Sequence, residues 1–156
     1  MSRRRALGSV FGAAALLLVP AFLKAQQRPA VLAEVWKSPT CGCCKEWVTH
    51  LEASGFRVKV HDVGNTAMRA KLRIPARLGS CHTALVAGYA IEGHVPAQHV
   101  LRLLRERPRA VGLAVAGMPV GSPGMDGPDY GDSRDPYDVL LVTADGGTRV
   151  FSSYFK

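Results

Sequence analysis

The sequence lacks the features that mark most nucleic-acid-binding and membrane-spanning proteins. Its 156 residues contain no block of lysines and arginines interleaved with aromatic residues, which gives nucleic-acid binding little support. The longest apolar run, from Ala6 to Val19, has fourteen residues. At ~1.5 Å per residue, a helix of this length covers about 21 Å, less than the ~30 Å hydrocarbon core of a bilayer. A permanent membrane span is therefore not predicted.

The first 25 residues have the composition of an export signal rather than of a folded domain. A basic segment, residues 2–5, precedes the apolar run, and small residues at Ala21 and Ala25 offer cleavage points. The basic segment also loosely resembles a twin-arginine signal, which leaves both the general and the folded-state export routes open. Removal of residues 1–25 takes away four positive charges and no acids, so the net charge falls from +8 to +4.

Cysteine is scarce, and three of the four cysteines lie within residues 41–44. The preceding residues, 31–36, read as a strand, and residues 45–54 read as a helix. The sulfurs are therefore expected at a helix N-terminus, where the helix dipole and unpaired N–H groups favour thiolate over thiol. Outside the cytoplasm, four thiols usually oxidise to disulfides unless they are kept reduced or bind metal.

The apolar periodicity predicts an α/β fold with the order β-α-β-α-β-β-α, which is the order of a thioredoxin-like domain. The first strand reads as central and buried, because its apolar run is nearly continuous. The further predicted elements are a strand over 56–61, a short helix capped by Asn65, strands over 83–87 and 89–95, and a helix that begins at Pro96.

The composition changes from Gly117 onward. A loop punctuated by glycine and proline precedes strands over 137–143 and 148–155, which flank Asp145-Gly146-Gly147 and predict a hairpin. The predicted organisation is a signal peptide over 1–25, a thioredoxin-like domain over 26–110, and a C-terminal extension over 111–156.

Cys41 and Cys44 have C-x-x-C spacing, which suits both disulfide exchange and metal binding. Cys43 complicates exchange, because it offers a competing partner for any Cys41–Cys44 bond. Cu(I) suits three crowded thiolates, because sulfur bridges such ions. Oxidoreductases of the thioredoxin fold place a cis-proline before the third strand, facing the C-x-x-C loop. This chain has Cys81 there instead, which indicates a fourth sulfur ligand rather than a buried apolar side chain.

Several motifs in order give a resemblance to a known family. C-G-C-C at 41–44, G-S-C-H-T-A at 79–84, G-Y-A-I-E-G-H-V-P-A at 88–97 and G-M-P-V-G-S-P-G-M at 117–125 closely resemble the CopG-like copper-resistance proteins of Gram-negative bacteria. The resemblance implies a periplasmic, thioredoxin-fold protein whose C-terminal extension helps to enclose copper. It also implies a role in converting Cu(I) and Cu(II) during copper resistance. The sulfur ligands that it implies are Cys41, Cys43, Cys44 and Cys81.

Weaker candidates surround this set. Met125, and after it Met118, are soft thioethers in a loop that makes a poor core, and His94 either ligates the metal or holds a turn. On an extended chain the side chain of His82 points away from Cys81, so we expect it to pack beside the site. Solvated surface positions are expected for His50, His61 and His99, and for the loop acids Asp126, Asp129, Asp132 and Asp135.

Alternative functions remain open. The first is a thiol–disulfide oxidoreductase with Cys41 as nucleophile and Cys44 as resolving thiol. The second is a protein with two structural disulfides. The third is a zinc site, although the C-x-C-C spacing crowds the tetrahedral geometry that zinc prefers. The leading hypothesis is a periplasmic copper protein that holds Cu(I), in one or several ions, in a thiolate cluster. Its expected partners are copper ions, with a copper exporter or a periplasmic electron carrier as further candidates and no nucleic acid.

Overall fold

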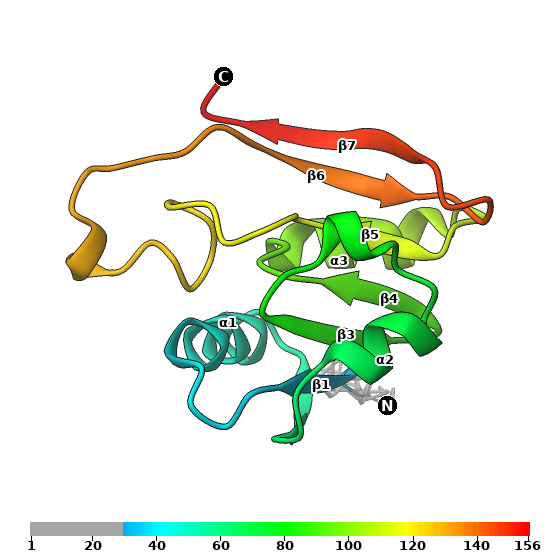
Figure 1. Cartoon of the computed structure of the whole chain (residues 1–156), viewed down its shortest axis with the longest axis horizontal. Helices are drawn as coiled ribbons and strands as arrows, with labels where there is room; N and C mark the ends of the chain where they lie inside the picture. Colours follow the sequence, from blue (N-terminus) through cyan, green and yellow to red (C-terminus); the bar gives the residue numbers. More distant parts are fainter. Residues whose placement is uncertain (1–29) are drawn as a thin grey trace, which may run out of the picture.

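The computed structural model describes residues 30–156 (Figure 1). The predicted signal peptide, residues 1–25, lies outside the described residues. Over residues 30–156, no helix is long and apolar enough to cross a membrane.

A seven-stranded mixed sheet organises the chain, with the strand order β2-β1-β3-β4-β5-β6-β7. β1 pairs in parallel with β2 and β4 in parallel with β5, whereas the other neighbours are antiparallel. The strands are β1 (Leu32–Lys37), β2 (Arg57–His61), β3 (His82–Val86), β4 (Tyr89–Glu92), β5 (Gly112–Ala114), β6 (Tyr137–Val142) and β7 (Thr148–Tyr154).

Helices and a short 3-10 turn pack on the sheet, and the apolar core of residues 30–156 consists of two clusters. Trp47 of α1 (Gly42–Ala53) and Leu103 of α3 (Ala97–Glu106) pack with Val35, Ile91 and other strand residues in the larger apolar cluster. The smaller cluster contains strand residues adjacent in sequence to those of the larger one: Ala90, Ala114 and Val142. They pack with Ile74 and Leu78 from the segment after α2 (Thr66–Lys71), which contains the 3-10 turn η1 (Ala76–Leu78). Because side chains alternate along each strand, neighbouring residues serve the two clusters in turn.

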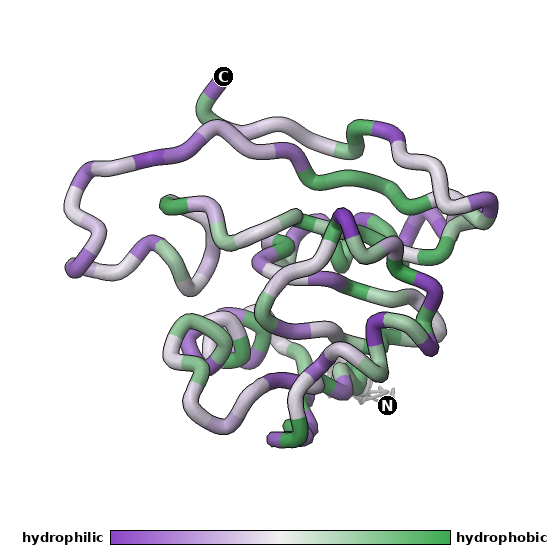
Figure 2. The backbone as a smooth tube through the Cα atoms, in the orientation of Figure 1, coloured by the Kyte–Doolittle hydropathy of each residue, from purple (hydrophilic) through white to green (hydrophobic). Residues whose placement is uncertain are grey.

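The C-terminal extension continues the same sheet. β6 pairs with β5, and β7 completes the predicted hairpin at the edge. In Figure 2 hydrophobic residues gather along β6, in keeping with the burial of Tyr137, Val139, Leu141 and Val142. Between β5 and β6 the chain makes a long excursion that contains the 3-10 turn η2 (Pro128–Tyr130).

The predicted element order is present, with local differences. The short strand β5 was missed, because its three residues carry no alternation that periodicity detects. β1 is central, as predicted, with β2 and β3 as its neighbours, but it is buried only at alternate residues, which are Ala33, Val35 and Lys37. Asn65 occupies the N-cap position of α2, as predicted, but its side chain makes no capping hydrogen bond; its amide donates instead to the Ser80 carbonyl oxygen at 3.1 Å.

Candidate metal centre

The cysteine loop lies where β1 passes into α1, as the sequence predicts. Cys41 is the residue before the helix, and Cys43 and Cys44 lie in its first turn. Cys41 and Cys44 form a disulfide, with their Cα atoms 5.4 Å apart. Cys43 keeps a free thiol, and its Sγ lies 3.5 Å from Cys41 Sγ. The loop is therefore in an oxidised state in which two of its three sulfurs are joined.

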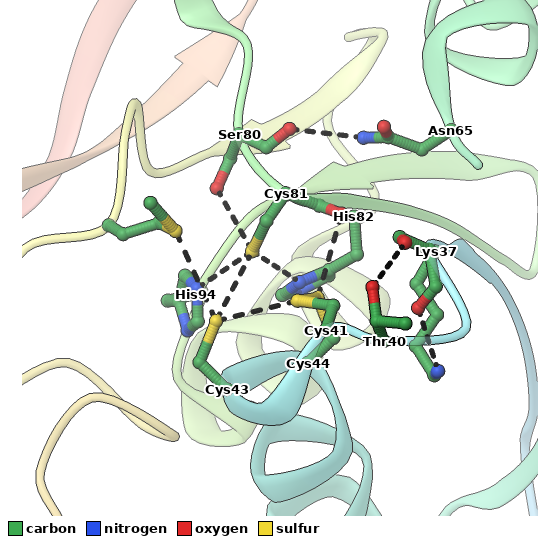
Figure 3. Close-up of a disulfide and its surroundings, with 12 residues drawn as sticks. Lys37, Thr40, Cys41, Cys43, Cys44, Asn65, Ser80, Cys81, His82 and His94 are labelled. Carbon is green, nitrogen blue, oxygen red and sulfur yellow. Dashed lines mark hydrogen bonds between the residues drawn. A yellow bond between two sulfur atoms is a disulfide. The ribbon is translucent and has the colours of Figure 1, made fainter.

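Cys81 brings a fourth sulfur to this loop from the turn before β3 (Figure 3). Its Sγ lies 3.8 Å from Cys43 Sγ, and the four cysteine sulfurs all lie within 4.8 Å of one another. The predicted convergence of Cys41, Cys43, Cys44 and Cys81 is thus present. Sulfur atoms at such separations suit one or several soft metal ions once the disulfide is reduced.

A buried carboxylate holds the turn that carries Cys81. Glu92, at the end of β4, is fully buried and accepts hydrogen bonds from Arg69 Nε at 2.7 Å and from the Ser80 backbone N–H at 2.7 Å. The Thr83 hydroxyl donates to its other oxygen at 2.5 Å. Arg69 Nη2 also donates to the Ser80 carbonyl oxygen at 2.5 Å. Both backbone groups of Ser80 are therefore fixed, which positions the neighbouring Cys81.

Neither Glu92 nor Arg69 was predicted to support the site. Burial raises the pKa of the Glu92 carboxyl, although Thr83, Ser80 and Arg69 favour its charged form. A signal was available, because Glu92 is a lone acid at the end of an apolar strand, where a charge is normally paired when buried.

His94 is fully buried and faces the sulfurs. Its Nε2 lies 3.1 Å from Cys81 Sγ, while its Nδ1 lies 2.8 Å from the carbonyl oxygen of Pro123. Because a carbonyl only accepts, Nδ1 carries the proton, and the neutral ring leaves a lone pair on Nε2. Burial lowers the pKa of His94, which keeps the ring neutral. Metal-binding histidines have this arrangement, with the outer nitrogen donating to a carbonyl or carboxylate.

His82 lies on the same side as Cys81, so the prediction that it points away was wrong. Its Nδ1 is 3.3 Å from Cys81 Sγ (Figure 3), and its ring packs against Trp47 with centroids 4.2 Å apart. Strand alternation does not apply because Cys81 precedes β3, which begins at His82. Over residues 30–156, His82 Nε2 is the one buried side-chain nitrogen or oxygen without a hydrogen-bond partner. Protonation at Nδ1 avoids an unpaired N–H donor and directs this N–H toward the Cys81 sulfur.

The two methionines differ in position. The sulfur of Met118 lies 4.0 Å from Cys43 Sγ, at a residue that is 51% exposed. The sulfur of Met125 accepts a hydrogen bond from the Tyr130 hydroxyl at 3.3 Å. Met118, which the sequence ranks below Met125, therefore contacts Cys43 through its sulfur.

Two of the three histidines expected at the surface are structural. His99 is only 8% exposed and its Nε2 lies 2.6 Å from the Tyr154 hydroxyl. His50 is half-buried and accepts the Ala97 backbone N–H at 3.0 Å. The expected solvation was wrong for His99, because Tyr154 and Phe151 of β7 contact its ring. His50 is partly covered, because its ring contacts the start of α3 at Ala97. His61 is half-buried and pairs with Glu34 at 2.9 Å.

The loop acids are exposed, as predicted, and two of them also accept backbone hydrogen bonds. Asp126 accepts from the Gly124 N–H at 3.0 Å and Asp135 from the Val120 N–H at 2.8 Å. The remaining two acids, Asp129 and Asp132, are exposed as well. The acids thus help to shape the loop that covers the cysteines.

This loop contacts the cysteine helix closely at Gly124. A Cβ at this position would lie 2.6 Å from the Cys43 carbonyl oxygen and 2.9 Å from the Trp47 backbone nitrogen, and its φ of +86° is left-handed. Glycine is the residue that tolerates both conditions. The C-terminal extension therefore covers the cysteine site through backbone contact, and it supplies the Pro123 carbonyl that orients His94.

The metal-free site holds protons that a metal ion would displace. Burial, with the neighbouring Cys43, raises the pKa of the Cys81 thiol to about 12. Cys81 is consequently a thiol at neutral pH without metal. Since soft metal ions bind thiolate, binding must release this proton.

Comparisons with known proteins find one family model and two similar solved structures. A model of a family described as "Protein of unknown function, DUF411" matches residues 78–125, which include Cys81 and His94. Two solved structures are similar over most of their length, titled "Copper resistance protein copG- Form 2" and "Copper resistance protein copG- Form 1". Each is 45% identical with a TM-score of 0.74, and the alignments cover 80% and 81% of this chain and 98% of each solved chain. No curated protein matches the chain.

Proposed function

The chain belongs to the family of the copper resistance protein CopG, and from this premise we propose that it binds Cu(I) in a cluster of cysteine thiolates. The proposed activity is interconversion of Cu(I) and Cu(II) during copper resistance. The proposed setting is a thioredoxin-like domain over residues 26–110 with the extension over 111–156. We also propose that residues 1–25 direct export to the periplasm and are then removed, and that a copper exporter or an electron carrier is the partner.

The single observation that carries this proposal is the convergence of four sulfurs on one point. Cys81 is separated from the cysteine loop by β2 and α2, yet its Sγ lies 3.8 Å from Cys43 Sγ. A cysteine with only a packing role has no need to face three others. Thiolate and thioether donors favour Cu(I), whereas imidazole also suits Cu(II). The lone pair of His94 Nε2 therefore supports a site that accepts both oxidation states.

Copper is the cargo in this proposal, and the residues around the sulfurs control its access. We propose Cys41, Cys43, Cys44 and Cys81 as ligands, with His94 and Met118 as additional donors. Met125 is a weaker candidate because Tyr130 occupies its sulfur. Cys44 and His94 are fully buried, whereas Met118 is exposed, so copper would enter on the Met118 side.

Competition titration tests the proposal. The reduced protein is titrated anaerobically with Cu(I) against a coloured Cu(I) chelator, and bound copper is counted after gel filtration. We expect at least one tightly bound Cu(I) per chain and a loss of at least tenfold in affinity in Cys81→Ser. His61→Asn is the matched control, because it removes a histidine that pairs with Glu34 instead of facing the cysteines. Failure of the reduced protein to take Cu(I) from the chelator would refute the proposal.

A second function is favoured by the Cys41–Cys44 disulfide. It lies at the start of a helix, Cys41 is partly exposed and Cys44 is buried, an arrangement suited to a nucleophile and a resolving thiol. Cys43 weighs against it, because a free thiol 3.5 Å from Cys41 competes for mixed disulfides. Insulin reduction with dithiothreitol tests this function; turnover well above the background rate would support it, and a background rate would exclude it.

A further inference from the structure

Cys41 and Cys44 are assigned two roles that exclude each other. As copper ligands they must be thiolates, but here their sulfurs are joined in a disulfide. The two states of the pair differ by two electrons and two protons. The same pocket therefore contains both the proposed copper ligands and a two-electron redox couple.

When Cys41 and Cys44 form the disulfide, other metal-donor atoms remain in the pocket. Cys43 and Cys81 remain free thiols with their sulfurs 3.8 Å apart. His94 Nε2 lies 3.1 Å from Cys81 Sγ, and the Met118 sulfur lies 4.0 Å from Cys43 Sγ. This set mixes sulfur and nitrogen and offers half the thiolates of the reduced site. Copper thus has a position beside the pair in either state.

The geometry also selects which sulfurs exchange the electrons. Cys41 and Cys44 are three residues apart and their Cα atoms are separated by 5.4 Å, within the range that a disulfide spans without backbone movement. Cys44 is fully buried, so its sulfur is shielded from foreign thiols, whereas Cys41 is accessible from solvent. Copper held by Cys43 and Cys81 would lie next to both.

From this arrangement we propose that the Cys41–Cys44 dithiol is the electron source for copper reduction. Two Cu(II) ions each accept one electron and become Cu(I). Cys41 and Cys44 lose two electrons and two protons and form one S–S bond. The step requires no other reductant. It rests on the proposed function, because copper must reach the cysteines.

Formation of the bond also lowers the capacity of the site. The disulfide removes two of the four thiolates, so the oxidised site holds fewer Cu(I) ions than the reduced site. Reduction of Cu(II) and release of Cu(I) are therefore coupled. A dithiol reductant would reset the pair: one of its thiolates attacks the accessible Cys41 sulfur and releases Cys44, and its second thiol then displaces Cys41 and closes the reductant's own disulfide.

The test adds Cu(II) sulfate to the reduced, metal-free full-length protein under argon, from zero to three equivalents. Paramagnetic Cu(II) is counted by electron paramagnetic resonance, which does not detect Cu(I). After an acid quench, free thiols are alkylated and the disulfide is mapped by mass spectrometry. We expect about two equivalents of Cu(II) to lose their signal, with the loss of two alkylated thiols and a Cys41–Cys44 linkage. The same protein, oxidised beforehand to the Cys41–Cys44 disulfide, is the matched control and is expected to leave most of the signal intact.

The outcomes separate this inference from the proposed function. If the reduced protein binds Cu(I) directly but the Cu(II) signal persists, only the electron-source inference fails. If the oxidised control removes the signal as fully as the reduced protein, or if the mapped bond joins Cys43 to Cys81, the inference is overturned as well. If neither copper ion binds, the proposed function fails.

Discussion

Truncation of the buried Glu92 tests the account of how Cys81 is positioned. Glu92→Ala leaves the Arg69 guanidinium, 18% exposed in its side chain, without its carboxylate at 2.7 Å. It also leaves the Ser80 N–H and the Thr83 hydroxyl without an acceptor. Removal of one partner from a buried pair costs about 3–5 kcal/mol. For a protein of this size, that loss lowers Tm by roughly 6–20 °C. Glu92→Gln keeps the shape and one acceptor oxygen, so we expect about half of this loss.

The assay combines thermal unfolding with Cu(I) competition on each variant. Both variants are expected to bind Cu(I) more weakly than the wild type, in the order of their stability losses, because the Ser80–Cys81 turn loosens. The matched control is Glu106→Gln, which breaks an exposed pair with Arg102 at the same 2.7 Å distance. This exposed pair contributes less than about 0.5 kcal/mol. Equal Tm and equal copper affinity in Glu92→Gln and Glu106→Gln would contradict a role of Glu92 in positioning Cys81.

Three further results are expected. Gly124→Ala should destabilise the fold by at least about 1–2 kcal/mol, because its φ of +86° is left-handed and its Cβ would strike backbone atoms; Gly127→Ala, with no atom within 4 Å, should stay within about 0.5 kcal/mol in urea unfolding. Burial lowers the pKa of His99, so the unfolded chain binds a proton there first as pH falls below about 6.5, and stability drops with decreasing pH. In His99→Gln the urea unfolding midpoint should fall less between pH 7 and pH 5 than in the wild type. An equal fall in both proteins would contradict this. In Trp36→Phe the remaining indole, Trp47, should lose fluorescence on Cu(I) addition, because its ring packs on a histidine in contact with Cys81; constant emission during stoichiometric binding would contradict the placement of copper.

Periodicity was sufficient for the larger elements of the fold. The strand over Phe56–His61 was predicted within one residue of β2, and the start of the helix at Pro96 within one residue of the start of α3, because their apolar residues repeat at one clear period. β5 could not be predicted, since its three residues are buried through pairing with β4 and β6, which are distant in sequence. The burial of His99 and the partial burial of His50 were missed for the same reason, because only the tertiary packing covers them.

The sequence predicted the cysteines of the candidate site, but not the residues that position Cys81. The spacing of Cys41, Cys43 and Cys44 places them on one turn of chain, and the order of elements brings Cys81 opposite. The contact of His82 with Cys81 was not predictable, because it depends on where β3 begins. The Glu92 network joins residues from three elements, and only the folded chain shows that they converge.

The covering segment over residues 115–136 leaves the sheet at β5 and returns to it at β6, and these strands are direct neighbours, with Ala114 opposite Leu140. Its two ends are therefore fixed side by side, whatever path the chain takes between them. A change in the length or sequence of this segment therefore leaves the strand order of the sheet unchanged. The metal-donor residues and the solvent access of the pocket can consequently vary while the sheet stays the same.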